Sequence, residues 1–201
     1  DFKWNALRKV SFYGQFVLDE FVIDNIRAGN GWWANKFGVQ FGGKYVDAFG
    51  LANLDLQGEI NLVRPYTYSH HSLYGSYSHY RQPIAHPLGA NFKEMVGIAR
   101  YQPLPRLNLT GKLVFTSIGR DLTADINWGS DVLKNNRTRE QEFNNTIAQG
   151  TSNDIVFGSF TASWQLKHTL FLDGSLLVRN STSMAGFYVD DTIITSVALR
   201  W

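Results

Sequence analysis

The chain of 201 residues contains no cysteine, so it has no disulfide, no thiolate metal site and no catalytic thiol. No segment approaches the roughly 20 consecutive apolar residues of a membrane-spanning helix, which excludes a helical membrane protein. The 19 Lys and Arg residues are scattered among 17 Asp and Glu residues, and the formal net charge is only +2. Because no basic stripe follows from this distribution, nucleic acid is not an expected partner. The first residues do not read as a signal peptide, so we expect an exported form to have lost one.

The composition favours β structure. Aromatic residues make up 14% of the chain, which also has 18 Gly, 9 Tyr and 6 Trp, a combination typical of sheets with many aromatic positions near water. The length suits one domain. We therefore expect residues 1–201 to form a single all-β unit.

Apolar and polar side chains alternate along about nine segments, and this period of two predicts strands. In residues 54–62, for example, one face carries Leu54, Leu56, Ile60 and Leu62, and the other carries Asp55, Gln57, Glu59 and Asn61. The clear segments are residues 9–20, 33–44, 54–62, 107–116, 156–166, 170–178 and 195–201, and residues 95–101 form an ambiguous one.

Short connections, near residues 103–106 and 167–169, alternate with a long one that we place at about 118–152. A further polar connection is expected around Phe187 to Asp191. Short turns on one side and long loops on the other are typical of outer-membrane barrels, so the pattern predicts an antiparallel transmembrane β-barrel. An odd strand number leaves an edge unpaired, which is costly in lipid. We therefore expect the chain to be the C-terminal part of a larger barrel; a soluble β-sandwich is the alternative.

The final segment supports a membrane location. Val197, Leu199 and Trp201 lie on one face of the last predicted strand, which ends in an aromatic residue. This ending is similar to the signal that bacterial barrel-insertion machinery recognises, although Phe is the usual last residue. We expect these three residues to act as the membrane-insertion signal in the outer membrane of a Gram-negative bacterium, with outer-membrane lipid as a partner.

The most unusual segment is residues 64–72, Arg-Pro-Tyr-Thr-Tyr-Ser-His-His-Ser, followed by residues 80–92. Residues 64–70, 80, 82–83, 85–91 and 44–50 resemble Wzi-type capsule-assembly proteins and RemB-like gliding-motility proteins of Bacteroidetes, most strongly over residues 37–94. The resemblance implies a large, non-enzymatic outer-membrane barrel that holds capsular polysaccharide at the surface, or a component of a gliding or envelope protein complex. No cofactor is expected.

The tyrosine-rich segment supplies the candidate ligand contacts, since flat tyrosine faces can stack on sugar rings while amides and imidazoles bind hydroxyls. The candidates for glycan binding are Tyr66, Tyr68, His70, Tyr80, Gln82, His86 and Asn91. An interfacial aromatic girdle is the alternative role for the tyrosines. The histidines show no fixed metal-ligand spacing, so polar loop histidines are the better interpretation.

Three other functions are weaker. A lipase-like enzyme would use Ser69 or Ser72 with a histidine, but the chain has no Gly-x-Ser-x-Gly elbow. Oxygen ligands for calcium are available in the long loop from Asp121, Asp125, Asn127 and Asp131, although they do not match an EF-hand loop. Four arginines in the strand-rich region, Arg27, Arg64, Arg81 and Arg100, are expected to pair with acids of neighbouring strands rather than to bind anions.

Overall fold

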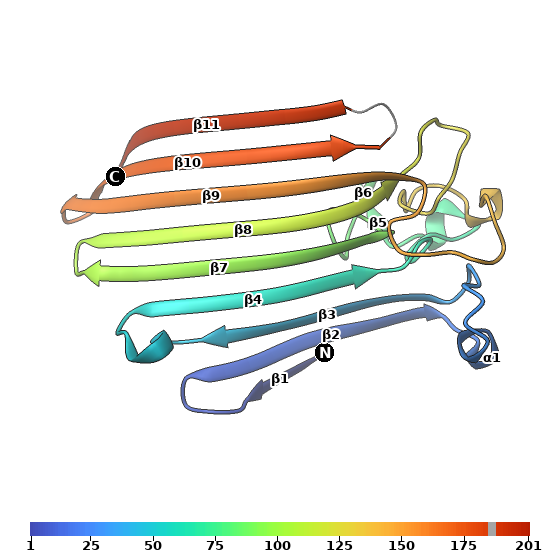
Figure 1. Cartoon of the computed structure of the whole chain (residues 1–201), viewed down its shortest axis with the longest axis horizontal. Coiled ribbons are helices and arrows are strands. Elements are labelled where there is room, and N and C mark those ends of the chain that lie inside the picture. The colour runs from blue at the N-terminus through green and yellow to red at the C-terminus, as the bar shows by residue number, and fades with distance from the viewer. Residues whose placement is uncertain (185–187) are drawn as a thin grey trace.

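The computed structural model describes residues 1–184 and 188–201 and is built around one antiparallel sheet of nine strands (Figure 1). The strands follow one another in chain order as β1 (Phe2–Asn5), β2 (Val10–Glu20), β3 (Lys36–Tyr45), β4 (Leu54–Val63), β7 (Phe92–Leu104), β8 (Leu107–Arg120), β9 (Thr151–Lys167), β10 (Leu170–Ser183) and β11 (Tyr188–Arg200). A second sheet holds only β5 (Ser78–His79) and β6 (Gln82–Pro83). The helices are α1 (Ile23–Arg27), η1 (Ala48–Gly50), η2 (Leu73–Gly75) and η3 (Asn136–Thr138).

The all-β antiparallel prediction is confirmed. Over the residues that the structure describes, β1 pairs only with β2 and β11 pairs only with β10, so the sheet has two open edges. No closed barrel is therefore formed by this part of the chain. Within residues 1–184 and 188–201, no helix combines the length and apolar character needed to cross a membrane.

The predicted strands differ from the observed ones mainly at polar ends. The long loop is shorter than predicted, because β8 and β9 stay paired as far as Arg120 and Thr151. Tyr188–Arg200 is one strand, so Asp191 lies in β11 and not in a connection, whereas Phe187 lies outside the described residues. The polar ends of these strands are held by backbone hydrogen bonds, which do not depend on the side chains. The alternation of side chains therefore does not reveal where these strands end. The strand β1 was not predicted because four residues are too few to show a clear alternation.

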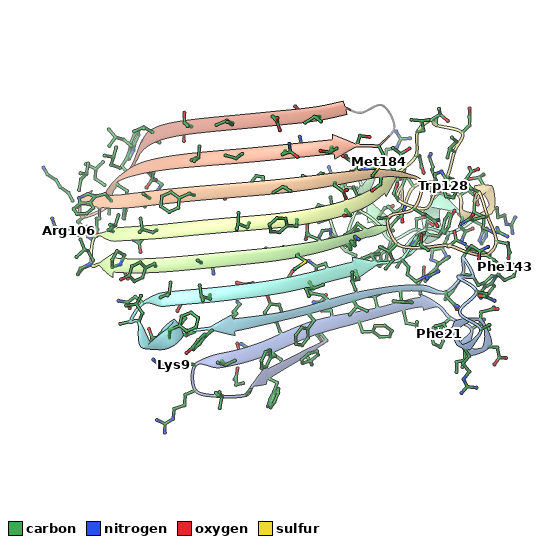
Figure 2. All side chains as sticks on the ribbon, viewed as in Figure 1. Lys9, Phe21, Arg106, Trp128, Phe143 and Met184 are labelled. Atoms are coloured by element: carbon green, nitrogen blue, oxygen red, sulfur yellow. The ribbon has the colours of Figure 1, made fainter. Side chains whose placement is uncertain are left out.

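The connections differ strongly between the two ends of the sheet (Figure 1). Residues 6–9, 46–53, 105–106 and 168–169 join strands at one end. The longer segments 21–35, 64–91 and 121–150 gather at the other end, where α1 also lies. In Figure 2, Lys9 and Arg106 mark the short-turn end, and Trp128 and Phe143 mark the long-loop end.

The two faces of the sheet have different chemistry. On the apolar face, register aligns one row across five strands, and all of its members are exposed: Phe41, Ile60, Met95, Phe115 and Val156. The same face continues to the β11 edge through exposed Leu176 and Val197. On the opposite, polar face, the matching row is Gln40, Asn61, Glu94 and Thr116. The sheet thus leaves its apolar face uncovered.

The buried core lies at the long-loop end, on the polar face. Segments 64–91 and 121–150 fold over this face and enclose Val63, Tyr68, Ala90, Phe92, Ile118 and Val132, with Leu88 and Leu133 packed against them. Both Phe92 and Ile118 are fully buried and pair across β7 and β8. Hydrophobic burial therefore fixes the loops onto the sheet instead of packing a second sheet against it.

Candidate functional site

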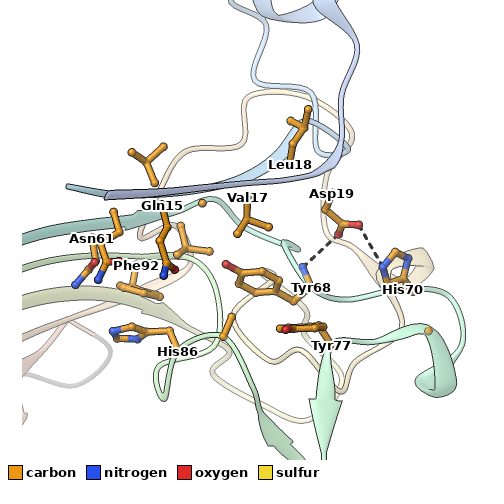
Figure 3. A pocket seen from close by; sticks show the side chains of 16 residues that line it. Gln15, Val17, Leu18, Asp19, Asn61, Tyr68, His70, Tyr77, His86 and Phe92 are labelled. Carbon is orange, nitrogen blue, oxygen red and sulfur yellow. Dashed lines mark hydrogen bonds and ion pairs between the residues drawn. The ribbon is translucent and has the colours of Figure 1, made fainter. Parts of the chain in front are cut away.

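A pocket of about 480 Å³ lies between the polar face and segment 64–91 (Figure 3). Its wall comes from β2, β3 and β4, which present the amide side chains of Gln15, Gln40 and Asn61. These three residues belong to one cross-strand row. Because strand residues of the same row point to the same side, the alternation in the sequence places three neutral hydrogen-bonding groups in one cavity.

The amide row is part of a longer hydrogen-bond network. The Asn61 amide donates to Glu59 at 3.0 Å and to Glu94 at 3.1 Å. Glu59 also accepts from the Tyr13 hydroxyl at 2.7 Å, and Gln57 donates to that hydroxyl at 2.8 Å. The network holds the Asn61 side chain of the wall in a fixed orientation, as a site that binds a polar ligand requires.

Two tyrosines form the aromatic side of the pocket. The rings of Tyr68 and Tyr77 lie 5.9 Å apart with an interplanar angle of 35°. Burial raises the pKa of the Tyr68 hydroxyl above its usual value. Its ring lies against Gly38, where a Cβ would come within 2.9 Å of the hydroxyl oxygen. Glycine at this position in β3 therefore makes room for the ring.

Histidines attach segment 64–91 to the sheet on both sides of the pocket. The His70 Nε2 lies 3.3 Å from an Asp19 carboxylate oxygen, and the Tyr68 backbone N–H donates to the other oxygen at 3.3 Å. Both contacts are drawn in Figure 3. The His86 Nε2 lies 3.4 Å from Glu94, and its ring stacks on Phe92 with centroids 4.5 Å apart. Each histidine thus positions a carboxylate that faces the pocket region.

Tyr66 and Lys36 hold the base of the segment. The Tyr66 hydroxyl donates to the Asn127 carbonyl at 2.8 Å, and burial raises its pKa to about 12. The fully buried Lys36 ammonium donates to the Ser69 carbonyl at 3.1 Å and lies 3.3 Å from Glu20. A buried cation is stable only with such partners. Lys36 therefore links segment 64–91, through Ser69, to the end of β2, through Glu20.

The structure separates the seven predicted glycan contacts into three groups. Tyr68, His70 and His86 line the pocket. Tyr66 and Asn91 are almost fully buried and bind loop backbone, so neither side chain offers a free surface to a ligand. Tyr80 and Gln82 lie in the β5–β6 hairpin, are exposed, and do not line the pocket.

The pocket residues that were not predicted from the sequence include the three wall amides and Tyr77. Gln15, Gln40 and Asn61 were visible only as the polar side of predicted strands, and Tyr77 only as one member of the tyrosine-rich segment. The polar alternation was therefore the signal for the wall. It could not show which strand positions the loops would cover.

The candidate calcium ligands have separate structural roles. Asp121 accepts from the Trp128 backbone N–H at 2.7 Å and forms an ion pair with Lys134 at 2.6 Å. The buried Asn127 side chain and Asp131 accept from loop backbone N–H groups, and Asp125 is exposed. Outside residues 185–187, no three His, Cys, Asp or Glu side chains are grouped to hold a metal ion.

The arrangement expected of a lipase is not formed by the described part of the chain. The Ser69 hydroxyl is buried and donates to the Tyr66 carbonyl at 2.8 Å. Neither Ser69 nor Ser72 hydrogen-bonds to a histidine side chain there. Comparison with protein-family models, curated proteins and solved structures found no match. What the pocket offers is amides, carboxylates and tyrosine rings, which suit binding of a hydroxyl-rich ligand.

Proposed function

We propose that this sheet forms part of the wall of an outer-membrane β-barrel that holds surface polysaccharide without catalysing a reaction. The apolar face would contact lipid, the polar face would line the lumen, and the long loops would face the cell exterior. In such a barrel the free edges of β1 and β11 are paired, because lipid cannot satisfy backbone hydrogen bonds.

One observation carries the membrane assignment. Large apolar side chains are exposed on the same face of the sheet from β2 to β11, including Phe16 at 60% and Val197 at 80%. Soluble proteins rarely expose a continuous apolar surface of this extent. A soluble β-sandwich would cover it with a second sheet, but the second sheet in the described residues has only two strands of two residues each.

The pocket supports the polysaccharide part of the proposal. Tyr77 is half exposed and stacks near Tyr68, which gives a flat apolar surface beside the amides of Gln40 and Asn61. Sugars present an apolar ring face and a rim of hydroxyls, so they match this combination of groups. The exposed Leu199 and Trp201 at the end of the chain suit lipid contact and the aromatic interface belt.

The absence of cysteine from the sequence allows a direct test of the faces. Leu176→Cys and Ser175→Cys place single thiols on adjacent residues of β10, one on the apolar face and one on the polar face. In lipid vesicles, a water-soluble maleimide is expected to label the Ser175 variant and leave the Leu176 variant unlabelled until detergent is added. Equal labelling of the two variants in vesicles would overturn the membrane assignment.

A further inference from the structure

Three cations in neighbouring central strands of the polar face form no ion pair with an acid within residues 1–184 and 188–201. Lys44 in β3, Arg100 in β7 and Lys112 in β8 share this face with Gln40, Glu94 and Thr116, since each lies an even number of residues away along its strand. All three are exposed, and none forms an ion pair with a residue that the structure describes; Lys44 approaches the Tyr13 ring at 5.7 Å. We name this set the basic tier.

Two other cations on the same face are neutralised, whereas Lys3, Arg120 and Lys167 form no ion pair with a described residue. In β10 and β11, Arg179 binds Asp190 at 3.0 Å and Arg200 binds Asp173 at 2.9 Å. The residue opposite Arg100 is Asp55, but its carboxylate accepts the backbone N–H of Asp47 at 3.3 Å instead. Within the described residues, Arg100 and Asp55 therefore form no ion pair although they lie opposite each other, in contrast to the structural pairing expected from the sequence.

The surroundings of the basic tier favour an anionic ligand. Lys112 lies opposite Ile98 on one side and Ser159 on the other, so no carboxylate is directly across from it. Arg100 pairs with Thr110, which makes Arg100 and Lys112 diagonal neighbours about 7–8 Å apart. The hydroxyls of Thr110, opposite Arg100, and Ser159, opposite Lys112, supply additional donors for an oxyanion.

The spacing suits a chain with repeated charges. Lys44 and Lys112 are three strand spacings apart, or about 14 Å. The pocket amide of Gln40 lies four residues from Lys44 along β3, which is about 13 Å. An extended ligand can therefore contact the pocket and the basic tier together, whereas a single small anion cannot.

We propose that the ligand of this face is an acidic polysaccharide, whose anionic substituents bind Arg100 and Lys112, with Lys44 as a further contact. The proposal rests on the proposed function, because it names the class of polysaccharide. Carboxylate and sulfate substituents share the chemistry that the basic tier recognises, and the guanidinium of Arg100 can bind either through two parallel hydrogen bonds.

The test uses the full chain refolded in detergent micelles and fluorescence anisotropy with three labelled hexasaccharides: an alginate oligomer, a sulfated maltohexaose and neutral maltohexaose. The double variant R100Q/K112Q is compared with R8Q/R106Q, which removes the same charge from exposed residues in turns at the short-turn end. We expect the first variant to weaken at least one anionic probe about tenfold, since each exposed ion contact contributes a few-fold. The control variant should change binding less than about twofold, and added salt should weaken the anionic probe.

Equal weakening by the two variants, or neutral maltohexaose binding as tightly as both anionic probes, would overturn the proposal. Weakening of the alginate oligomer alone identifies carboxylate as the bound group, and weakening of the sulfated probe alone identifies sulfate. If Tyr77→Ala weakens binding of the neutral probe, and R100Q/K112Q changes the binding of no probe, the acidic ligand is wrong and the polysaccharide role stands. Failure of the membrane assignment is detected separately, by the cysteine-labelling experiment.

Discussion

Asn91→Ala is expected to loosen the long loop 121–150. The Asn91 amide donates to the carbonyls of Gln149 at 2.9 Å and Gly119 at 3.3 Å, and its oxygen accepts the Gln149 backbone N–H at 3.1 Å. Three buried hydrogen bonds contribute about 3 kcal/mol in total. The residue also has φ +60°, a conformation that asparagine tolerates better than alanine. A local cost of about 3–4 kcal/mol follows, which raises the open population of the loop by more than about 100-fold.

Limited proteolysis measures this opening, because trypsin can cleave the loop after Lys134 and Arg137 only when it is accessible. Cleavage within 121–150 should accelerate strongly in Asn91→Ala, while cleavage in the unfolded chain stays the same. Asn108→Ala is the matched control, since Asn108 is exposed and its side chain makes no hydrogen bond within residues 1–184 and 188–201. The reasoning is refuted if Asn91→Ala is cleaved within about twofold of the unmodified protein.

Three further outcomes are expected. Gly38→Ala should lower the free energy of unfolding by about 1–3 kcal/mol, because the new Cβ would lie 2.9 Å from the Tyr68 hydroxyl. In denaturant unfolding, the double variant with Tyr68→Phe should recover part of this lost stability. The Arg139 guanidinium lowers the pKa of Glu142, so this contact stabilises the loop above the ordinary carboxyl pKa of 4.5 and is lost as the pH falls through the lowered value. Arg139→Gln should move that acid transition upward, toward the ordinary carboxyl pKa, in a tryptophan fluorescence titration, because Glu142 still accepts from the Trp32 and Trp33 indoles. Leu176→Arg should cost about 2–4 kcal/mol of folding stability in vesicles, measured by urea unfolding, if the apolar face meets lipid; an unchanged midpoint would contradict that contact.

The sequence predicted the sheet well where alternation was clear. Residues 54–62 and 107–116 lie within β4 and β8, and the antiparallel order follows from short turns such as residues 168–169. Polar strand ends could not be predicted, because their pairing depends on backbone hydrogen bonds and not on side-chain period. Asn153, for instance, continues the ladder by pairing with Ile118.

The site was predicted less well than the sheet, for a physical reason. Tyr66 and Tyr68 both adopt left-handed backbone conformations, with φ +64° and +74°, in a segment without regular structure. Their side chains consequently reach different surroundings: one binds the Asn127 carbonyl and the other lines the pocket. No periodic rule gives the direction of a side chain in such a segment. Residue type indicated a polar site, but burial decided which tyrosine a ligand can reach.

The distribution of charge along the polar face connects the pocket with the basic tier. Toward the long loops, Asp19 and Glu94 are engaged by His70 and His86, so their charge is partly offset. Toward the short turns, the exposed Lys112 has no such partner in the described residues. A polyanion on this face would therefore meet acids that already have polar partners at the long-loop end, and would be attracted by exposed cations at the short-turn end.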